Sequence, residues 1–180
     1  MELRFAVVED RLPDAQRLES LLRLAFGGGQ PLVCDHYESG DAFLAAFPSK
    51  NYQVVFLDIC MEGTNGIETA RILRRTDPDL LLVFVTSSPE YVWDAFPVHP
   101  FDYLLKPYRE EKLFQLADEL RRVYRPGGQR AFDVDFMETV FERPFRLEAV
   151  AERDFPAASS SPRKLGGHLN GCRIGFDAGG

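Results

Sequence analysis

Short apolar runs along the chain are typical of buried strands. Residues 54–57 read Val-Val-Phe-Leu, and residues 80–85 are apolar throughout. Runs of this kind are expected of parallel strands that helices cover on both faces. Three further segments have a weaker signal of the same type. The five predicted strands are residues 3–8, 31–34, 54–57, 80–85 and 103–105.

Between these runs, apolar residues recur at the three- and four-residue spacing of a helix that buries one face. After Pro13, leucine and alanine positions between residues 18 and 25 keep this spacing, and the glycines at 27–29 end it. Ser39 is a predicted N-cap for the helix after the second strand. The remaining predicted helices begin at Gly66, lie over residues 91–96, and pass through Leu113, Leu116, Ala117, Leu120 and Tyr124.

Five strands and five helices therefore alternate along residues 1–125. This order predicts an α/β fold, because right-handed crossovers through helices join parallel neighbours in one sheet. We expect a five-stranded parallel sheet that is doubly wound, with the five helices divided between its two faces.

Residues 126–180 follow a different pattern. Residues 132–136 alternate Phe or Val with Asp, which is a strand signal, and residues 145–147 are a second candidate. After Asp154 the sequence is rich in Ala, Ser, Pro and Gly and loses its periodicity. We therefore predict one domain over residues 1–125 and a short, largely irregular C-terminal tail over residues 126–180.

Chemically reactive side chains stand at the ends of four predicted strands. Glu9 and Asp10 follow the first strand, Asp58 follows the third, Thr86 follows the fourth, and Lys106 follows the fifth. Each has an ordinary explanation when taken alone, as a turn residue, a helix cap or a surface lysine. Because the carboxyl ends of parallel strands share one edge, where ligands bind, their joint occurrence favours a common site.

Three clustered carboxylates repel one another unless a cation lies among them. Two unit charges about 4 Å apart interact by about 4 kcal/mol at an effective dielectric constant of about 20. Mg²⁺ fits such a cluster, because it binds carboxylates, a carbonyl and several waters in an octahedron. Lys106 and the Thr86 hydroxyl add groups that can contact phosphoryl oxygens. Together these residues predict a phosphoryl-accepting site.

The same residues resemble the receiver domain of two-component response regulators. The resemblance rests on the acidic pair at 9–10, Asp58 after its apolar strand, Gly66, Phe-Val-Thr-Ser at 84–87 and Tyr-Leu-Leu-Lys-Pro at 103–107. The spacings of 28 residues from Asp58 to Thr86 and 20 from there to Lys106 also fit. Residues 90–107 are similar to the LytTR-type subgroup, whose members usually append a DNA-binding output domain.

The resemblance implies the flavodoxin-like receiver fold and a phosphorelay function without enzymatic turnover of a separate substrate. Asp58 would be the phosphoacceptor. Glu9, Asp10 and Asp58, with the backbone carbonyl of Cys60, would hold Mg²⁺. The implied phosphoryl donor is a sensor histidine kinase.

The resemblance also implies roles for three residues on the last two strands. Thr86 and Lys106 would contact the phosphoryl group, and Tyr103 would be the aromatic residue whose rotamer changes on phosphorylation. Packing in the core is an equally good explanation of Tyr103. The surface over residues 91–124 is the candidate for a phosphorylation-dependent homodimer.

Two departures from the family pattern concern positions around the site. Glu62 stands where the family often has proline, and it adds negative charge beside the site. Cys60 and Ser87 occupy positions that the family uses to tune the lifetime of the acyl phosphate, so that lifetime stays open. An aspartyl-phosphate hydrolase would need a second Asp at the position of Cys60, which disfavours that alternative.

A DNA-binding LytTR-type regulator is the other alternative. The subgroup likeness favours it, but 55 tail residues are too few for an output domain of about a hundred residues. A truncated gene, a frame change and a tail with its own partner all remain open. DNA binding is expected only if a functional output domain exists.

Charge and composition argue against a nucleic-acid-binding protein, a membrane-spanning protein and a zinc-binding protein. The formal net charge is −7, and residues 1–125 hold 20 acidic against 14 basic residues, so no basic surface matches a nucleic-acid backbone. No apolar run approaches the roughly 20 residues of a membrane span. The three cysteines lack the spacing of a zinc site. We expect a cytoplasmic protein with no membrane partner.

Overall fold

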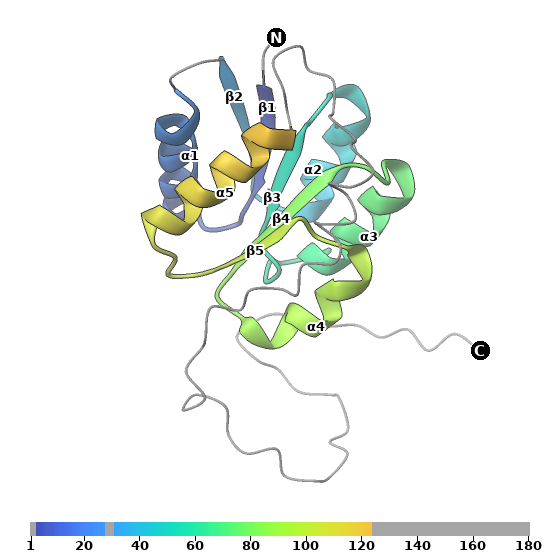
Figure 1. The fold of residues 1–180 in the computed structure, drawn as a ribbon. Coiled ribbons are helices and arrows are strands. Elements are labelled where there is room, and N and C mark those ends of the chain that lie inside the picture. The colour runs from blue at the N-terminus through green and yellow to red at the C-terminus, as the bar shows by residue number, and fades with distance from the viewer. Residues whose placement is uncertain (1–2, 28–30, 124–180) are drawn as a thin grey trace, which may run out of the picture.

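Five parallel strands form the centre of the fold (Figure 1). They are β1 (Leu3–Val8), β2 (Leu32–Tyr37), β3 (Val54–Leu57), β4 (Leu81–Thr86) and β5 (Asp102–Leu105). Their order across the sheet is β2-β1-β3-β4-β5, so the winding reverses direction next to β1. The structure is a computed structural model and describes residues 3–27 and 31–123.

Helices cover both faces of this sheet. They are α1 (Leu12–Phe26), α2 (Gly40–Ala46), α3 (Gly66–Thr76), α4 (Val92–Ala95) and α5 (Glu110–Val123). Figure 1 shows α1 and α5 side by side on one face, and α2 and α3 on the other. The short α4 lies between two 3₁₀ turns, Pro89–Tyr91 and Phe96–Val98. The predicted doubly wound α/β fold is confirmed.

Two apolar cores explain why the strand sequences are apolar without alternation. On β1, Phe5 and Val7 pack toward α1 and α5, whereas Ala6 and Val8 pack toward α2, α3 and α4. All four side chains are at most 1% exposed. Residues 5–8, 54–57 and 82–85 are buried on both faces of the sheet, and all of them are apolar.

Strand β2 is longer than predicted, because it continues past residues 31–34 through three polar or aromatic positions. The carboxylate of Asp35 accepts hydrogen bonds from Tyr52 (2.8 Å), Lys50 (3.1 Å) and Arg4 (3.0 Å). Burial opposes ionisation of Asp35, but these donors outweigh it and lower its pKa. A half-buried carboxylate with partners is compatible with a strand, and the partners come from distant parts of the chain.

The first residues of α2 and α3 follow ordinary capping rules. The hydroxyl of Ser39 accepts a hydrogen bond from the N–H of Ala42 (3.1 Å), which confirms the predicted N-cap of α2. The side chain of Asn65 caps α3 in the same way, by accepting from the N–H of Glu68 (2.9 Å).

Several expectations fall on residues outside the described ones. These are the last helical position, Tyr124, the strand candidates at 132–136 and 145–147, and the irregular tail over 126–180. Within residues 3–27 and 31–123, no helix has the length and apolar content that crossing a bilayer demands.

One arginine connects the end of α3 both to the segment that follows it and to a turn 24 residues further along the chain. Arg74, in the last turn of α3, donates hydrogen bonds to the carbonyls of Val98 (3.0 Å), His99 (3.2 Å), Leu80 (2.9 Å) and Pro78. The planar guanidinium reaches all four acceptors at once, which a lysine ammonium cannot do. Arg74 therefore fixes the end of α3 to the segment just before β4 and to the turn after α4.

We expect Arg74→Ala to lower the free energy of unfolding by about 2 kcal/mol, because it removes charged donors from several carbonyls. Arg74→Lys should recover less than half of that loss. Urea unfolding followed by circular dichroism measures both. Arg75→Ala, an exposed position in the same turn, is the matched control and should change the stability by less than about 0.5 kcal/mol. Equal losses at the two positions would contradict the proposed tie.

Candidate functional site

Three carboxylates gather at the carboxyl end of the central strands. Glu9 and Asp10 follow β1 and Asp58 follows β3, and one oxygen of each lies within 4.8 Å of the others. The strands bring them together because Val8 and Leu57 are paired neighbours in the sheet. Glu9 and Asp58 are buried, at 4% and 5% exposed, whereas Asp10 is exposed.

Backbone hydrogen bonds hold the two buried acids in place. The N–H of Asp58 donates to the carbonyl of Val8 (2.9 Å), and the N–H of Glu9 donates to the carbonyl of Tyr37 (2.9 Å). The His36 Nε2 lies 2.8 Å from the carbonyl oxygen of Glu9. Ladder contacts of this kind fix the carboxylates on the rigid sheet instead of on a loose loop.

Lys106 brings a positive charge into this cluster. Its Nζ lies 2.5 Å from Glu9 Oε2, 3.0 Å from Asp58 Oδ2 and 3.4 Å from Asp14 Oδ2. Its backbone N–H donates to the carbonyl of Thr86 (2.8 Å), and the peptide bond to Pro107 is cis.

Burial and mutual repulsion disturb the ionisation of these groups. Burial, and then the charge of Asp58, raises the pKa of Glu9 to about 7, and the same causes raise the pKa of Asp10. Burial alone would lower the pKa of Lys106, but the charges of Asp58 and Glu9 outweigh it and raise that pKa. One lysine therefore leaves the cluster short of positive charge, and an all-oxygen donor set of this kind suits Mg²⁺.

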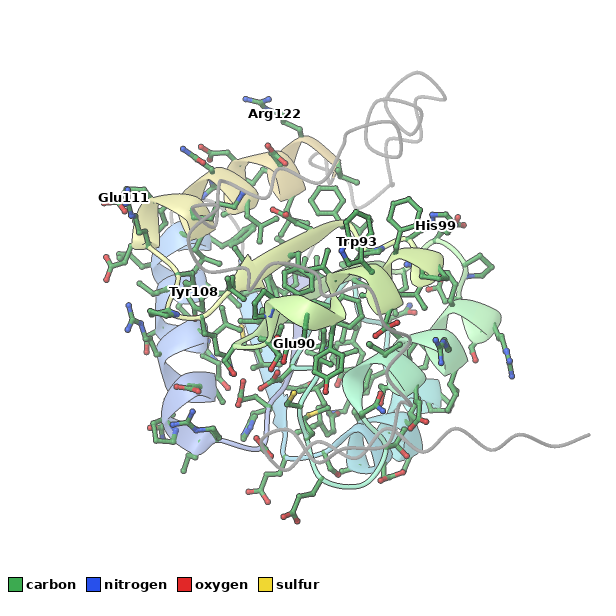
Figure 2. All side chains as sticks on the ribbon, turned by 90° about the horizontal axis from the view of Figure 1, so that it is seen from below. Glu90, Trp93, His99, Tyr108, Glu111 and Arg122 are labelled. Carbon is green, nitrogen blue, oxygen red and sulfur yellow. The ribbon has the colours of Figure 1, made fainter. Side chains whose placement is uncertain are left out.

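A second group of contacts joins the end of β4 to Tyr103 on β5. The Thr86 side chain is fully buried, and its Oγ1 accepts a hydrogen bond from the N–H of Ser88 (3.4 Å). The Tyr103 hydroxyl donates to the carbonyl of Ser88 (2.8 Å). Burial, and then the charge of Glu90, raises the pKa of Tyr103, so the phenol stays protonated. Figure 2 views the molecule from below, with Glu90 labelled in the turn after β4.

The loop between β3 and α3 closes the site on another side. The N–H of Cys60 donates to Asp58 Oδ1 (3.2 Å), and its thiol lies 3.5 Å from the hydroxyl of Ser88. The carboxylate of Asp41 on α2 accepts from the hydroxyl and the N–H of Thr64 (2.6 and 3.1 Å). The loop is therefore anchored both to the pocket and to a neighbouring helix.

The structure brings together four of the residues selected from sequence: Glu9, Asp10, Asp58 and Lys106. Thr86 is the last residue of β4, Tyr103 lies within β5, and the two are linked through Ser88. Sequence reasoning missed Asp14, His36 and Ser88. Nothing in the local sequence distinguishes these three from an ordinary helix acid, strand residue or turn residue.

Comparison with known proteins decides the family. The sequence matches the response regulator receiver domain over residues 5–118, a stretch that contains every residue of this pocket. The chain belongs to the response regulator receiver family. The resemblance drawn from the strand-end motifs is therefore confirmed, and the chain carries the receiver domain of a two-component response regulator.

Relatives of this receiver protein include LytT-type regulators, as the subgroup resemblance predicts. The chain is 34% identical over 139 residues to the sensory transduction protein LytT of Oceanobacillus iheyensis. The matched stretch covers 75% of this chain and 54% of that protein. LytT of Bacillus subtilis is 27% identical, with 68% of this chain and 50% of that protein covered. The chain spans about half the length of the curated relatives it matches.

Solved receiver domains share the fold. The response regulatory domain of MrkE from Klebsiella pneumoniae has a TM-score of 0.61 at 25% identity, covering 67% of this chain and 96% of that domain. TrrA from Thermotoga maritima, solved in complex with Mg²⁺ and BeF, has a TM-score of 0.56 at 29% identity, covering 66% of this chain and 98% of that one. A complex with Mg²⁺ is therefore known for one structurally similar response regulator.

Proposed function

We propose that this receiver protein accepts a phosphoryl group on Asp58 in a Mg²⁺-dependent reaction, and that a sensor histidine kinase is the donor. The observation that carries the proposal is the cluster of Glu9, Asp10 and Asp58 with the ammonium of Lys106 3.0 Å from Asp58. Family membership supports the kinase as the partner, and the Mg²⁺ complex of TrrA supports the cation.

The chemistry follows from the residues of the pocket. An oxygen of Asp58 attacks the phosphorus atom of the donor, a new O–P bond forms, and the bond from phosphorus to the leaving group breaks. Glu9, Asp10, Asp58 and the carbonyl of Cys60 would hold Mg²⁺, which would supply positive charge against the carboxylates and the phosphoryl oxygens. Lys106 is placed to neutralise charge on the transferred group. No further acid is positioned two residues after Asp58, because that position is Cys60.

The readout proposed for this switch passes through β4 and β5. Thr86 would donate its hydroxyl to the phosphoryl group, and its present bond with the N–H of Ser88 would change. The carbonyl of Ser88 also accepts a hydrogen bond from the hydroxyl of Tyr103, so a shift of Ser88 alters the environment of Tyr103.

The surface beside this switch is the proposed binding site for a second copy of the chain. Two large apolar side chains on it, Trp93 and Phe96, are 75% and 53% exposed, which supports the proposal. Figure 2 labels Trp93 on α4.

We assign this switch to a receiver domain over residues 1–125 and treat residues 126–180 as a separate region. The second candidate function is that of a LytTR-type DNA-binding regulator, as the subgroup resemblance implies. The LytT relatives have room for a further region, because the match covers only 54% and 50% of their length. Salt-dependent binding of duplex DNA by this chain would be the measurement in its favour.

Phosphorylation with a small-molecule phosphodonor tests the proposal. We expect wild-type protein with acetyl phosphate and Mg²⁺ to gain the mass of one phosphoryl group, and Asp58→Asn to gain none, because the nucleophilic carboxylate is lost. Chelation of Mg²⁺ should also prevent the gain. Glu111→Gln, which removes an exposed acid on α5, is the control and should be labelled like the wild type. Wild-type labelling of Asp58→Asn would refute the assignment.

A further inference from the structure

Asp14 is the acidic residue in the first turn of α1. An acid at this position usually stabilises the helix start, either through the helix dipole or by accepting from the N–H of the N-cap residue. Here the N-cap residue is Arg11, and its N–H donates to Glu9 Oε1 (3.2 Å). Glu9, a residue of the pocket, therefore accepts the hydrogen bond that Asp14 would otherwise accept from the N–H of Arg11. The carboxylate of Asp14 points to other partners.

The partner of Asp14 is the lysine of the pocket. Asp14 Oδ2 lies 3.4 Å from Lys106 Nζ, and 3.5 Å from the guanidinium of Arg11. The arginine is 70% exposed, so solvent weakens that contact, whereas the lysine side chain is only 14% exposed. The contact with Lys106 joins residues that are 92 positions apart, so it depends on the fold and not on the helix.

An ammonium group has three hydrogens to donate. Those of Lys106 face three carboxylates, Glu9 at 2.5 Å, Asp58 at 3.0 Å and Asp14 at 3.4 Å. Glu9 and Asp58 belong to the three-carboxylate cluster, and Asp14 does not. The lysine therefore competes with any cation for Glu9 and Asp58, while Asp14 offers it an acceptor outside the cluster.

We propose that Asp14 is a positioning residue for Lys106, which keeps the ammonium at the rim and so leaves Glu9 and Asp58 more available to a divalent cation. This inference rests on the proposed function, because it concerns the same Mg²⁺ site. Without the carboxylate of Asp14, the ammonium of Lys106 pairs only with Glu9 and Asp58. A cation must then displace the ammonium from both acids.

Mg²⁺ binding to four forms of the full chain tests the inference by titration calorimetry: wild type, Asp14→Asn, Lys106→Met and the double variant. We expect Asp14→Asn to weaken Mg²⁺ binding about fivefold, the scale of one partly exposed ion pair. In the Lys106→Met background the same change should cost less than about twofold, because the ammonium that Asp14 positions is gone. Asp94→Asn, an exposed acid on α4, changes the net charge equally and should leave Mg²⁺ affinity unchanged.

The possible outcomes separate this inference from the proposed function. If wild-type protein binds no Mg²⁺, the metal site itself is refuted. If the wild type binds Mg²⁺ and Asp14→Asn binds it equally well, the role of Asp14 is refuted and the site stands. Equal losses in both backgrounds would mean that Asp14 acts as a distant charge, which also overturns the inference. Asp14→Glu and Asp14→Gln form a second pair of equal length, in which only the former should keep the affinity near the wild-type level.

Discussion

Replacing Gly66 with alanine is expected to lower the free energy of unfolding by at least about 3 kcal/mol and to impair the pocket at Asp58. Gly66 is the first residue of α3, and its N–H donates to the carbonyl of Ile59 (3.0 Å). A Cβ on Gly66 would lie 2.1 Å from the carbonyl oxygen of Asp58 and 2.8 Å from the Ile59 Cα. Both atoms belong to the backbone, so no side-chain rotation relieves the contact.

Thermal and urea unfolding measure the stability loss, and phosphorylation by acetyl phosphate measures the displacement of Asp58. Gly63→Ala in the same loop is the matched comparison. Gly63 has a φ of 77°, which costs an alanine roughly 1–2 kcal/mol, but its Cβ would meet only the side-chain carboxylate of Asp41. We therefore expect Gly63→Ala to cost less than Gly66→Ala. A larger loss at Gly63, or wild-type labelling of a destabilised Gly66→Ala, would contradict the close-approach argument.

The fold was predictable because apolar runs and helical spacing report burial directly. The predicted strand at residues 54–57 coincides with β3. A strand that is buried on both faces is apolar at every position, so the apolar run marks both of its ends. Strand β2 was underestimated for the opposite reason. Asp35 breaks the apolar pattern, and only the folded chain shows that Arg4, Lys50 and Tyr52 supply its hydrogen bonds.

The site was predictable to the extent that strand ends meet at one edge of a parallel sheet. That rule selects Glu9, Asp58 and Lys106 from positions up to 97 residues apart, and the structure places their charged groups in contact. Their chemical roles stay predictions that the labelling experiments test. Asp14 and Ser88 could not be selected, because their contacts depend on side-chain direction after packing, which residue type and spacing do not encode.

The same packing buries carboxylates in the pocket, and their ionisation lowers the stability of the metal-free protein. Glu9 is 4% exposed, and burial together with Asp58 raises its pKa to about 7 from the ordinary value of 4.5. The folded state therefore holds a proton that the unfolded state releases between these two pH values. Stability is greatest below about pH 4.5 with respect to this group, and it is lost as the pH rises toward 7 and Glu9 must ionise in a buried site.

Glu9→Gln should accordingly stabilise the metal-free protein at pH 8 by about 3 kcal/mol, since glutamine has no charge to bury. Near pH 4.5 the two proteins should have equal stability, because Glu9 is then protonated in the folded state. Mg²⁺ should raise the unfolding midpoint of the wild type at pH 8, because it binds the folded state, and should raise that of Glu9→Gln much less.

Unfolding by urea at a series of pH values, with and without Mg²⁺, measures this difference. Glu111→Gln, which removes an exposed acid on α5 (Figure 2), is the control and should change stability by less than about 0.5 kcal/mol at every pH. A stability gain for Glu9→Gln that is the same at pH 4.5 and pH 8 would show that ionisation of Glu9 is not its cause. A loss of stability at pH 8 would mean that the ion pair with Lys106 outweighs the burial of the carboxylate, and the charge deficit argued for this pocket would be wrong.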